Sequence, residues 1–176
     1  MQNPEATHIT IRRAVPADAE AIIRLINQAD AESAFMTREP GEFDVSLEAE
    51  QALLAKQGSE RAWFVAVDGG TVIGLVNLDR VHTRTRLRHR AVIGLVILRA
   101  YWSQGIGRRL MEQVIAWAKE QDIEQIELGV VAANVRAHGL YVRLGFVETG
   151  RLPHVFKYRD GTYADEIKML LQLVRN

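Results

Sequence analysis

Residues 95–110 join a strand-like run to a glycine turn and the start of a helix, and these residue types could bind a phosphate. Gly105 and Gly107 lie in the turn, where the missing Cβ lets a ligand approach the backbone closely. The first N–H groups of the following helix are unpaired, and together with the helix dipole they favour an anion. The pattern therefore predicts a turn that holds a phosphorylated ligand.

Arg108 and Arg109 stand in the first turn of that helix. Positive charge there works against the helix dipole unless an anion lies nearby, which supports the phosphate interpretation. The alternative is a tight strand-to-helix turn with two arginines in solvent. The glycine spacing alone favours neither, so the rest of the sequence has to decide between them.

Composition limits the other functions. The 176 residues include 22 basic residues, 22 acidic residues and no cysteine. This length suits a single domain over residues 1–176, and the balanced charge provides no field that would attract nucleic acid or an anionic membrane. The missing cysteines exclude disulfides, thiolate catalysis and cysteine-bound metals. No apolar run approaches the roughly 20 residues of a membrane span and the N-terminus lacks a leader pattern, so we expect a cytoplasmic protein.

Apolar periodicity predicts strands and helices in one definite order. The expected elements are a strand at 8–14, a helix after Pro16, a helix from Ser46 to about Lys56, a hairpin at 62–78, a strand at 91–98, a helix from the glycine turn to near Gln121, a strand at 126–130, a short helix from Asn134 that Gly145 ends, and a hairpin around 158–162. In the second helix, Leu47, Leu53 and Leu54 are expected to face inward. The order predicts a mixed α+β sheet that is mostly antiparallel at its start.

Two familiar phosphate-binding folds do not fit this order. A dinucleotide-binding turn would need a third glycine where Leu110 stands, and it would follow the first strand of a parallel sheet. A P-loop would need Gly-Lys-Ser/Thr after the turn, which residues 108–110 do not supply. The basic segment 82–90 has no aromatic residue for base stacking, so a loop in solvent is favoured over a nucleic-acid site.

Two motifs together resemble the GCN5-related N-acetyltransferases. They are the glycine turn and residues 134–146, which follow it by about thirty residues, and the resemblance extends over about residues 7–171. It implies the fold of that family, a central and mostly antiparallel mixed sheet flanked by helices. Residues 39–44 and 160–166 are similar to a bacterial branch that acetylates amino acids and small amines.

The resemblance implies acetyl-CoA as the donor and assigns roles to particular residues. Backbone groups of Ile97, Leu98 and Arg99 would pair with the pantetheine arm. The diphosphate would bind the turn, made of Gln104, Gly105, Ile106, Gly107, Arg108 and Arg109. Asn134 would bond the pantetheine and Tyr141 would stand beside the thioester sulfur. Each of these two also has a structural interpretation, because Asn134 suits a helix N-cap and Tyr141 falls on the apolar face of its helix.

Acetyl transfer to an amine needs a neutral amine, an oriented carbonyl and a proton for the leaving thiolate. A tyrosine hydroxyl, with a pKa of about 10, is protonated at neutral pH, so Tyr141 is our candidate general acid. Backbone N–H groups near Leu98 would polarise the carbonyl. Transfer is expected to be direct because the chain has no cysteine to carry the acetyl group.

The general base is where the chain departs from the family. Relatives often carry a carboxylate on the strand before the turn, and here Val92 stands at that position. Glu127 on the next strand is a candidate base by location, with a solvent-facing strand residue as the alternative interpretation. A water chain, or an amine that arrives neutral, would also serve. The first position of the turn motif, Gln or Arg in relatives, is Trp102.

Two hypotheses follow for the function. The first is an N-acetyltransferase that acts on a primary amine of a small molecule, such as an amino acid, a polyamine or an amine-bearing toxin. The second is an acyl-CoA-binding sensor with little or no turnover. For the acceptor we expect residues 35–43, Asn77, Asp79, the last hairpin and His154. The histidines lack the spacing of metal ligands, so we assign no metal. Relatives suggest a homodimer.

Overall fold

The structure is a computed structural model that describes residues 9–173. Its elements follow the predicted order: β1 (Thr10–Arg13), α1 (Ala19–Glu32), α2 (Leu47–Ala55), β2 (Arg61–Asp68), β3 (Thr71–Arg80), β4 (Arg90–Ile97), α3 (Ile106–Glu120), β5 (Gln125–Val131), α4 (Val135–Arg143), β6 (Val147–Lys157) and β7 (Tyr163–Gln172). Short 3-10 turns precede α1 and α3, at Pro16–Asp18 and Arg99–Tyr101. Residue 8, where we expected the first strand to begin, lies outside the described residues.

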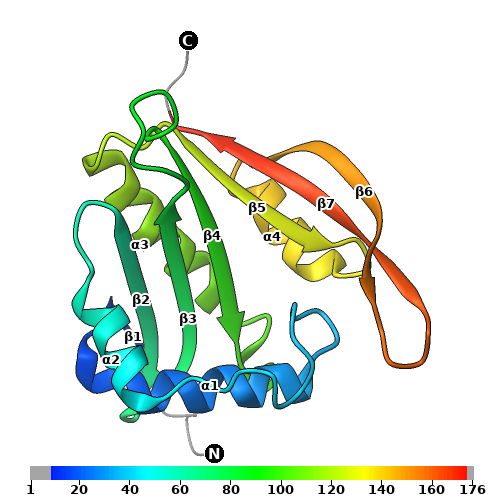
Figure 1. Ribbon diagram of the computed structural model, residues 1–176, viewed down its shortest axis with the longest axis horizontal. Coiled ribbons are helices and arrows are strands. Elements are labelled where there is room, and N and C mark those ends of the chain that lie inside the picture. The colour runs from blue at the N-terminus through cyan, green and yellow to red at the C-terminus, as the bar shows by residue number, and fades with distance from the viewer. Residues whose placement is uncertain (1–8, 174–176) are drawn as a thin grey trace, which may run out of the picture.

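The seven strands form one sheet in the order β1-β2-β3-β4-β5-β7-β6. All neighbouring pairs are antiparallel except β4 and β5, which run parallel. This parallel pairing covers only Arg90–Val92 against Gln125–Glu127, and the two strands then separate toward their carboxyl ends (Figure 1). The predicted mixed, mostly antiparallel sheet is therefore confirmed, and its one parallel pair opens a gap in the middle of the sheet.

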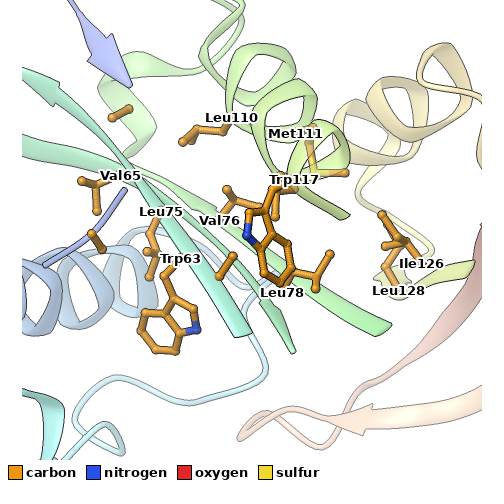
Figure 2. Close-up of a cluster of buried hydrophobic side chains, with 14 of the residues drawn as sticks. Trp63, Val65, Leu75, Val76, Leu78, Leu110, Met111, Trp117, Ile126 and Leu128 are labelled. Carbon is orange, nitrogen blue, oxygen red and sulfur yellow. The ribbon is translucent and has the colours of Figure 1, made fainter. Parts of the chain in front are cut away.

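Helices cover both faces of the sheet. In Figure 1, α1 and α2 lie in front of β2, β3 and β4, while α3 and α4 lie behind. The apolar residues of α3 recur at helical spacing and are buried against the sheet: Leu110, Met111, Val114, Trp117 and Ala118. Figure 2 shows Leu110, Met111 and Trp117 on one face of the strands and Trp63 on the other. Trp63 therefore belongs to the layer that α1 and α2 cover.

Helix α2 starts at the predicted residue, but a different set of its side chains is buried. The Ser46 side chain caps it by accepting a hydrogen bond from the Ala49 N–H at 3.2 Å. Leu54 is buried as expected, whereas Leu47 is exposed, so the prediction for Leu47 is wrong. The buried position one turn later is taken by Glu50, because the helix rests on α1 and the 3-10 turn along a different stripe.

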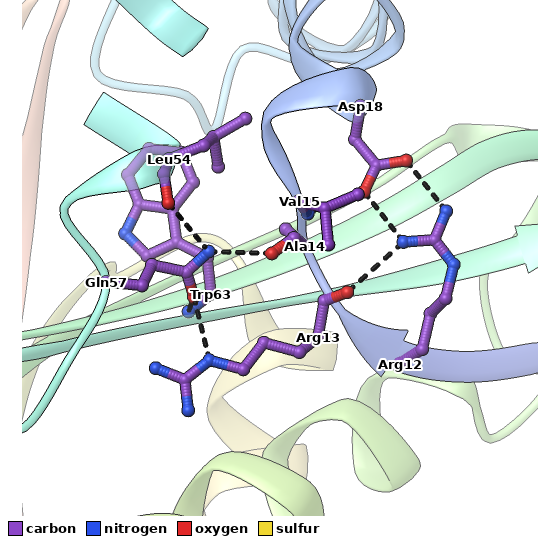
Figure 3. Close-up of polar contacts among 8 residues, drawn as sticks. All are labelled: Arg12, Arg13, Ala14, Val15, Asp18, Leu54, Gln57 and Trp63. Carbon is purple, nitrogen blue, oxygen red and sulfur yellow. Dashed lines mark hydrogen bonds and ion pairs between the residues drawn. The ribbon is translucent and has the colours of Figure 1, made fainter. Parts of the chain in front are cut away.

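Gln57 fastens the end of α2 to the first two strands (Figure 3). Its amide nitrogen donates to the carbonyl of Ala14 at 2.7 Å and to that of Leu54 at 3.3 Å. Its amide oxygen accepts from the Trp63 N–H at 2.8 Å and from Arg13 Nε at 3.1 Å. A single side chain thus holds α2, β1 and β2 in a common frame.

Replacing Gln57 by alanine should lower the free energy of unfolding by about 2 kcal/mol, because several hydrogen bonds disappear and buried partners lose their mates. Gln51→Ala, on the exposed side of α2, is the matched control and should change stability by less than about 0.5 kcal/mol. Urea unfolding monitored by circular dichroism measures both. Equal stabilities for the two variants would contradict the anchoring role.

Asp18 fixes the segment just before α1, in the same region, through hydrogen bonds to Arg12 and Val15. Arg12 donates to both carboxylate oxygens of Asp18 at 2.7 Å, and the Val15 N–H donates to one of them at 2.8 Å. These donors, with the Arg12 side chain contributing most, hold the pKa of Asp18 below its usual range.

Among residues 9–173, no helix is long and apolar enough to cross a membrane.

Candidate active site

A cavity of about 1110 Å³ lies where β4 and β5 separate. Its walls come from α1, the loop that follows it, α2, strands β2 to β5, the glycine turn, α4, β6 and β7. One end is bounded by the turn and α4, which carry the predicted cofactor residues. The other end lies under α1 and α2, on the sheet face that holds Trp63 and Asn77. The cavity thus joins the predicted cofactor region to the predicted acceptor region.

The edge of β4 that faces the gap carries backbone groups that are not paired with a neighbouring strand. The Leu98 N–H donates to the Ile73 carbonyl at 3.0 Å, so Leu98 is turned toward β3. Because an antiparallel ladder alternates, Leu95 and Ile97 direct their backbone groups the other way, toward β5. The β5 pairing has ended by then, and both residues line the cavity. Leu95 and Ile97 can therefore pair with an extended ligand.

This geometry differs from the expectation for Leu98 and Arg99. The N–H of Leu98 is used by β3, and the N–H of Arg99 donates to Glu32 Oε2 at 2.8 Å. Neither residue lines the cavity. Ile97 does, although its carbonyl accepts from Trp102 Nε1 at 2.8 Å, which leaves its N–H for a ligand. Because the ladder alternates, the backbone groups on the open side belong to Ile97, which was expected, and to Leu95, which was not.

The glycine turn has the backbone needed to bind an anion. Gly105 precedes α3 with a φ of 80°, a left-handed conformation that other residues adopt at a cost. A Cβ on Gly105 would meet nothing within 4 Å, so that side of the turn is open. Gly107 is packed tightly, since a Cβ there would lie 3.0 Å from a Leu140 methyl and 3.2 Å from an Ile97 methyl. Gly105, Ile106, Gly107 and Arg108 line the cavity.

Two residues of the predicted turn point elsewhere. Gln104 donates its amide to the Ala100 carbonyl at 3.0 Å, and Arg109 donates to the Ile9 carbonyl at 2.8 Å. Neither lines the cavity. Arg108 does, and it also pairs with Glu112 at 2.7 Å one turn along the helix. Of the two arginines that oppose the helix dipole, only Arg108 is thus available to a ligand in the cavity.

Arg136 is a cation that the sequence reasoning missed. It lies in the first turn of α4, lines the cavity and stacks over the indole of Trp102, with its guanidinium carbon 3.4 Å from the ring centroid. Burial and the nearby charge of Arg99 lower the pKa of Arg136. The tryptophan that replaces Gln or Arg in the turn motif therefore supports a cation from another helix. A basic residue two positions after Asn134 was the available signal.

Asn134 and Tyr141, both on or beside α4, line the same cavity. The Asn134 side chain caps α4 by accepting from the Ala137 N–H at 3.2 Å. The predicted structural role of Asn134 is therefore present, and this cap uses its Oδ1, which leaves the N–H₂ group for a ligand. Tyr141 is buried, with its ring 5.7 Å from that of Phe146. Burial raises the pKa of Tyr141 to about 12, which keeps its hydroxyl protonated.

Glu127 is not brought to the cavity. It pairs in register with Val92 on β4, and Arg90 donates to both of its carboxylate oxygens, at 2.5 and 2.9 Å. This ion pair lies where β4 and β5 are still hydrogen-bonded, before the gap opens. Glu127 is absent from the lining residues, so we do not propose it as the base. Val92 is exposed and cannot take a proton.

The acceptor region contains part of what was expected. Phe35, Arg38, Phe43 and Asn77 line the cavity, while Asp79 and His154 do not. Asp79 pairs with Arg61, and His154 packs against the Tyr163 ring at 5.0 Å. The last hairpin contributes Phe156 and Glu166 to the wall. Glu50 and Trp63 were missed, because an apolar stripe on α2 and a strand-like run gave no sign of a cavity between them.

Comparison with known proteins identifies the family. The model of the "Acetyltransferase (GNAT) family" matches residues 24–146. A GNAT-family acetyltransferase from Streptococcus pneumoniae shares the fold with a TM-score of 0.90 and 28% identity, covering 94% of this chain and 100% of that one. YncA from Salmonella typhimurium, solved with its cofactor acetyl-CoA, has a TM-score of 0.84 at 24% identity and covers 97% of this chain and 96% of its own.

Two curated relatives act on different acceptors. The L-amino acid N-acyltransferase MnaT of Escherichia coli is 24% identical over 168 residues, which cover 94% of each chain. The N-alpha-acetyltransferase MAK3 of Arabidopsis thaliana is 30% identical over 107 residues, which cover 61% of this chain and 55% of MAK3. The family match spans most of the sheet and both predicted motifs. The chain therefore belongs to the GNAT family of acetyltransferases and is an N-acetyltransferase whose acetyl donor is acetyl-CoA.

Proposed function

We propose that this enzyme acetylates a primary amine of a small molecule, with direct transfer from acetyl-CoA. The observation that carries the proposal is one continuous cavity, which reaches from the glycine turn past Tyr141 to the sheet face under α1 and α2. Acetyl-CoA supplies an activated acetyl group as a thioester. The residues of this chain bind and orient it, exclude water and provide the proton for the leaving sulfur.

The residues present fit that donor. Leu95 and Ile97 offer backbone groups along the open edge of β4, where the amides of the pantetheine arm can pair as a further strand would. The N–H groups at the start of α3 and the cations Arg108 and Arg136 suit a diphosphate. Asn134 offers its amide to the pantetheine. The hydroxyl of Tyr141, which burial keeps protonated, donates to the departing thiolate.

The acceptor end favours a small molecule over a polypeptide. The Tyr158 hydroxyl donates to the Ala34 carbonyl at 3.0 Å, and Arg159 pairs with Glu39 at 3.3 Å. These contacts join the β6–β7 turn to the loop after α1. That loop lines the cavity, and the strands next to the turn contribute Phe156 and Glu166 to its wall. A polypeptide that extended out of the cavity between these two segments would have to break both contacts. We therefore favour an amino acid, a polyamine or an amine-bearing toxin.

An acetyl-CoA consumption assay tests the proposal. The panel contains L-amino acids, spermidine and a peptide with a free N-terminal amine. We expect turnover with at least one small amine and a lower kcat/KM for the peptide. Turnover with the peptide alone would move the enzyme to the protein acetyltransferases. Binding of acetyl-CoA without turnover on any amine would instead favour the sensor hypothesis for this chain.

Arg136→Ala should weaken acetyl-CoA binding about 10-fold, because a charge-assisted contact to a phosphate is worth about 1.5–3 kcal/mol. Isothermal titration calorimetry measures the affinity. Arg84→Ala, in the exposed basic loop, is the control and should leave it unchanged. An unaltered affinity in Arg136→Ala would remove this residue from the donor site, and Trp102 would then be only a packing residue.

We further propose that the chain is one domain and works as a homodimer in the cytoplasm. Support for association comes from β6, one of the two edge strands, which is exposed along nearly all of its length. Its exposed side chains include Val147, Leu152 and Val155. An exposed apolar edge strand of this kind is suited to pairing with a second copy. The location in the cell stays a prediction from the sequence.

A further inference from the structure

Three carboxylates among the described residues line the cavity: Glu32, Glu50 and Glu166. Two of them have partners. Glu32 accepts from the Arg99 N–H at 2.8 Å, and Glu166 pairs with Lys168 at 2.7 Å. Glu50 differs, because its Oε1 atom is buried without a hydrogen-bond partner in residues 9–173. The cavity wall therefore contains one carboxylate whose hydrogen-bonding capacity is unused.

Glu50 is deeply buried, with 2% of its surface exposed. Glutamate is almost never buried to this degree unless it is paired, because moving a carboxylate out of water costs several kcal/mol. Burial raises the pKa of Glu50, and burial is the sole cause of that shift. No ion pair within the described chain offsets this cost. A group that destabilises the fold in this way is a candidate for binding a ligand.

One cation that lines the cavity on this side, Arg38, is already paired. Arg38, in the loop before α2, donates to both oxygens of Asp30, at 2.9 and 3.3 Å. Asp30 is itself buried, and the positive charge of Arg38 balances its negative charge. Glu50 is therefore a carboxylate of this wall that Arg38 does not neutralise. A positively charged group in the cavity would complement it.

A second unpartnered polar atom lies on the same wall. Trp63, 9% exposed, has no partner for its Nε1–H in the described part of the chain, and its side chain lines the cavity with Glu50. Trp63 offers a donor and Glu50 an acceptor. Gln57 accepts from the Trp63 N–H at 2.8 Å and donates to the carbonyl of Leu54, one turn after Glu50 on α2, at 3.3 Å (Figure 3). Gln57 thus links α2 and β2, the two elements that carry these groups.

We propose that Glu50 binds the protonated amino group of the acceptor as it enters the cavity and thereby determines specificity for cationic amines. The bound ammonium then releases one proton to water, and the neutral amine attacks the thioester. The inference rests on the proposed function. It also assigns Trp63 Nε1–H to an oxygen of the same acceptor, such as a hydroxyl or carboxylate. Glu50 thus supplies at the acceptor end the carboxylate that Val92 and Glu127 do not supply along the central strands. Its role is to attract and hold the amine in the cavity.

Glu50→Gln tests the proposal, because it keeps the shape and removes the charge. With the best small amine of the panel above, kcat/KM should fall about 10- to 100-fold, the effect of losing a charged hydrogen bond. The fall should appear mainly in the KM for the amine, while the KM for acetyl-CoA stays within about twofold. p-Anisidine, an aromatic amine that is uncharged at pH 7.5, serves as the neutral probe. Its kcat/KM should change by less than about threefold.

Stability provides a readout that does not depend on turnover. Because a neutral side chain is cheaper to bury than an unpaired carboxylate, Glu50→Gln should raise the melting temperature by about 2–4 °C at pH 7.5. Glu48→Gln, on the exposed side of α2, is the matched control and should change neither activity nor stability. A lower melting temperature for Glu50→Gln would mean that the carboxylate is paired within the protein, for example with Trp63, and would overturn the proposal.

The kinetic outcomes separate this inference from the proposed function. If the wild-type enzyme acetylates small amines and Glu50→Gln does so equally well, the proposal for Glu50 is overturned and the proposed function stands. Equal losses with the cationic amine and with p-anisidine would also overturn it, because the effect would not depend on charge. If the wild-type enzyme binds acetyl-CoA and acetylates only the peptide, the small-molecule assignment fails.

Discussion

Tyr141→Phe should lower kcat about 100-fold or more while leaving the affinity for acetyl-CoA unchanged. The variant removes only a hydroxyl, so the packing of the ring against Phe146 at 5.7 Å is kept. Proton transfer by a positioned side chain contributes about 10²- to 10⁴-fold to a rate, and the leaving thiolate needs that proton. Steady-state kinetics with the best small amine measures kcat, and calorimetry measures the binding of acetyl-CoA.

Tyr163→Phe is the control for this variant, because Tyr163 is half exposed on β7 and does not line the cavity. It should keep the wild-type rate. An unchanged kcat in Tyr141→Phe would remove Tyr141 from the chemistry. Weaker acetyl-CoA binding at an unchanged rate would give it a packing role.

The pH dependence of the same step follows from burial. Because burial raises the pKa of Tyr141 to about 12, above the ordinary value of about 10, the hydroxyl stays protonated through the range of the assay. We therefore expect no alkaline fall in kcat between pH 7 and about pH 10. A fall in that range that disappears in Tyr141→Phe would contradict the shift.

Gly107→Val should abolish measurable acetyl-CoA binding, with affinity reduced at least about 100-fold. A Cβ at this position would lie 3.0 Å from Leu140 and 3.2 Å from Ile97, and valine adds two further methyl groups. Overpacking of this kind costs about 1–3 kcal/mol and is relieved by moving the backbone. The start of α3 would then separate from β4 and α4, so the N–H groups of the turn and the edge of β4 would no longer face one ligand.

Gly150→Ala is the matched control, since its φ is not positive and a Cβ there would meet nothing within 4 Å. It should bind acetyl-CoA like the wild type. Calorimetry gives the affinities, and circular dichroism with thermal melting shows that Gly107→Val remains folded at the assay temperature. A folded Gly107→Val that binds normally would contradict the role we give to the packed turn.

The order of the elements was predictable because each one carries a local pattern. The stripe on α3, the Asp68-Gly69-Gly70 turn between β2 and β3, and the cap at Ser46 act over a few residues, so they can be recognised without a tertiary structure. Leu47 was mispredicted for the opposite reason. A short helix has several apolar residues, and its neighbours in space decide which of them is buried.

The position of individual site residues depended on contacts between distant segments. Whether Leu98 or Ile97 faces the gap is decided by the register of β4 against β3, and a shift of one residue reverses every backbone direction. Glu127 lies opposite Val92, where β4 and β5 are still paired. Its carboxylate therefore binds Arg90 and lies away from the cavity. Arg136 meets Trp102 only because α4 returns to the start of α3.

The sequence by itself determined the order of the elements and the fold class, since glycine spacing, helix starts and apolar periodicity are local properties of the chain. The resemblance of its two motifs to a known family added the family and the donor. The tertiary structure decided which carboxylates are neutralised and which cavity wall remains charged. Burial and pairing depend on what the folded chain places around a group, and no local pattern distinguishes the exposed Glu48 from the buried Glu50 two residues later on the same helix.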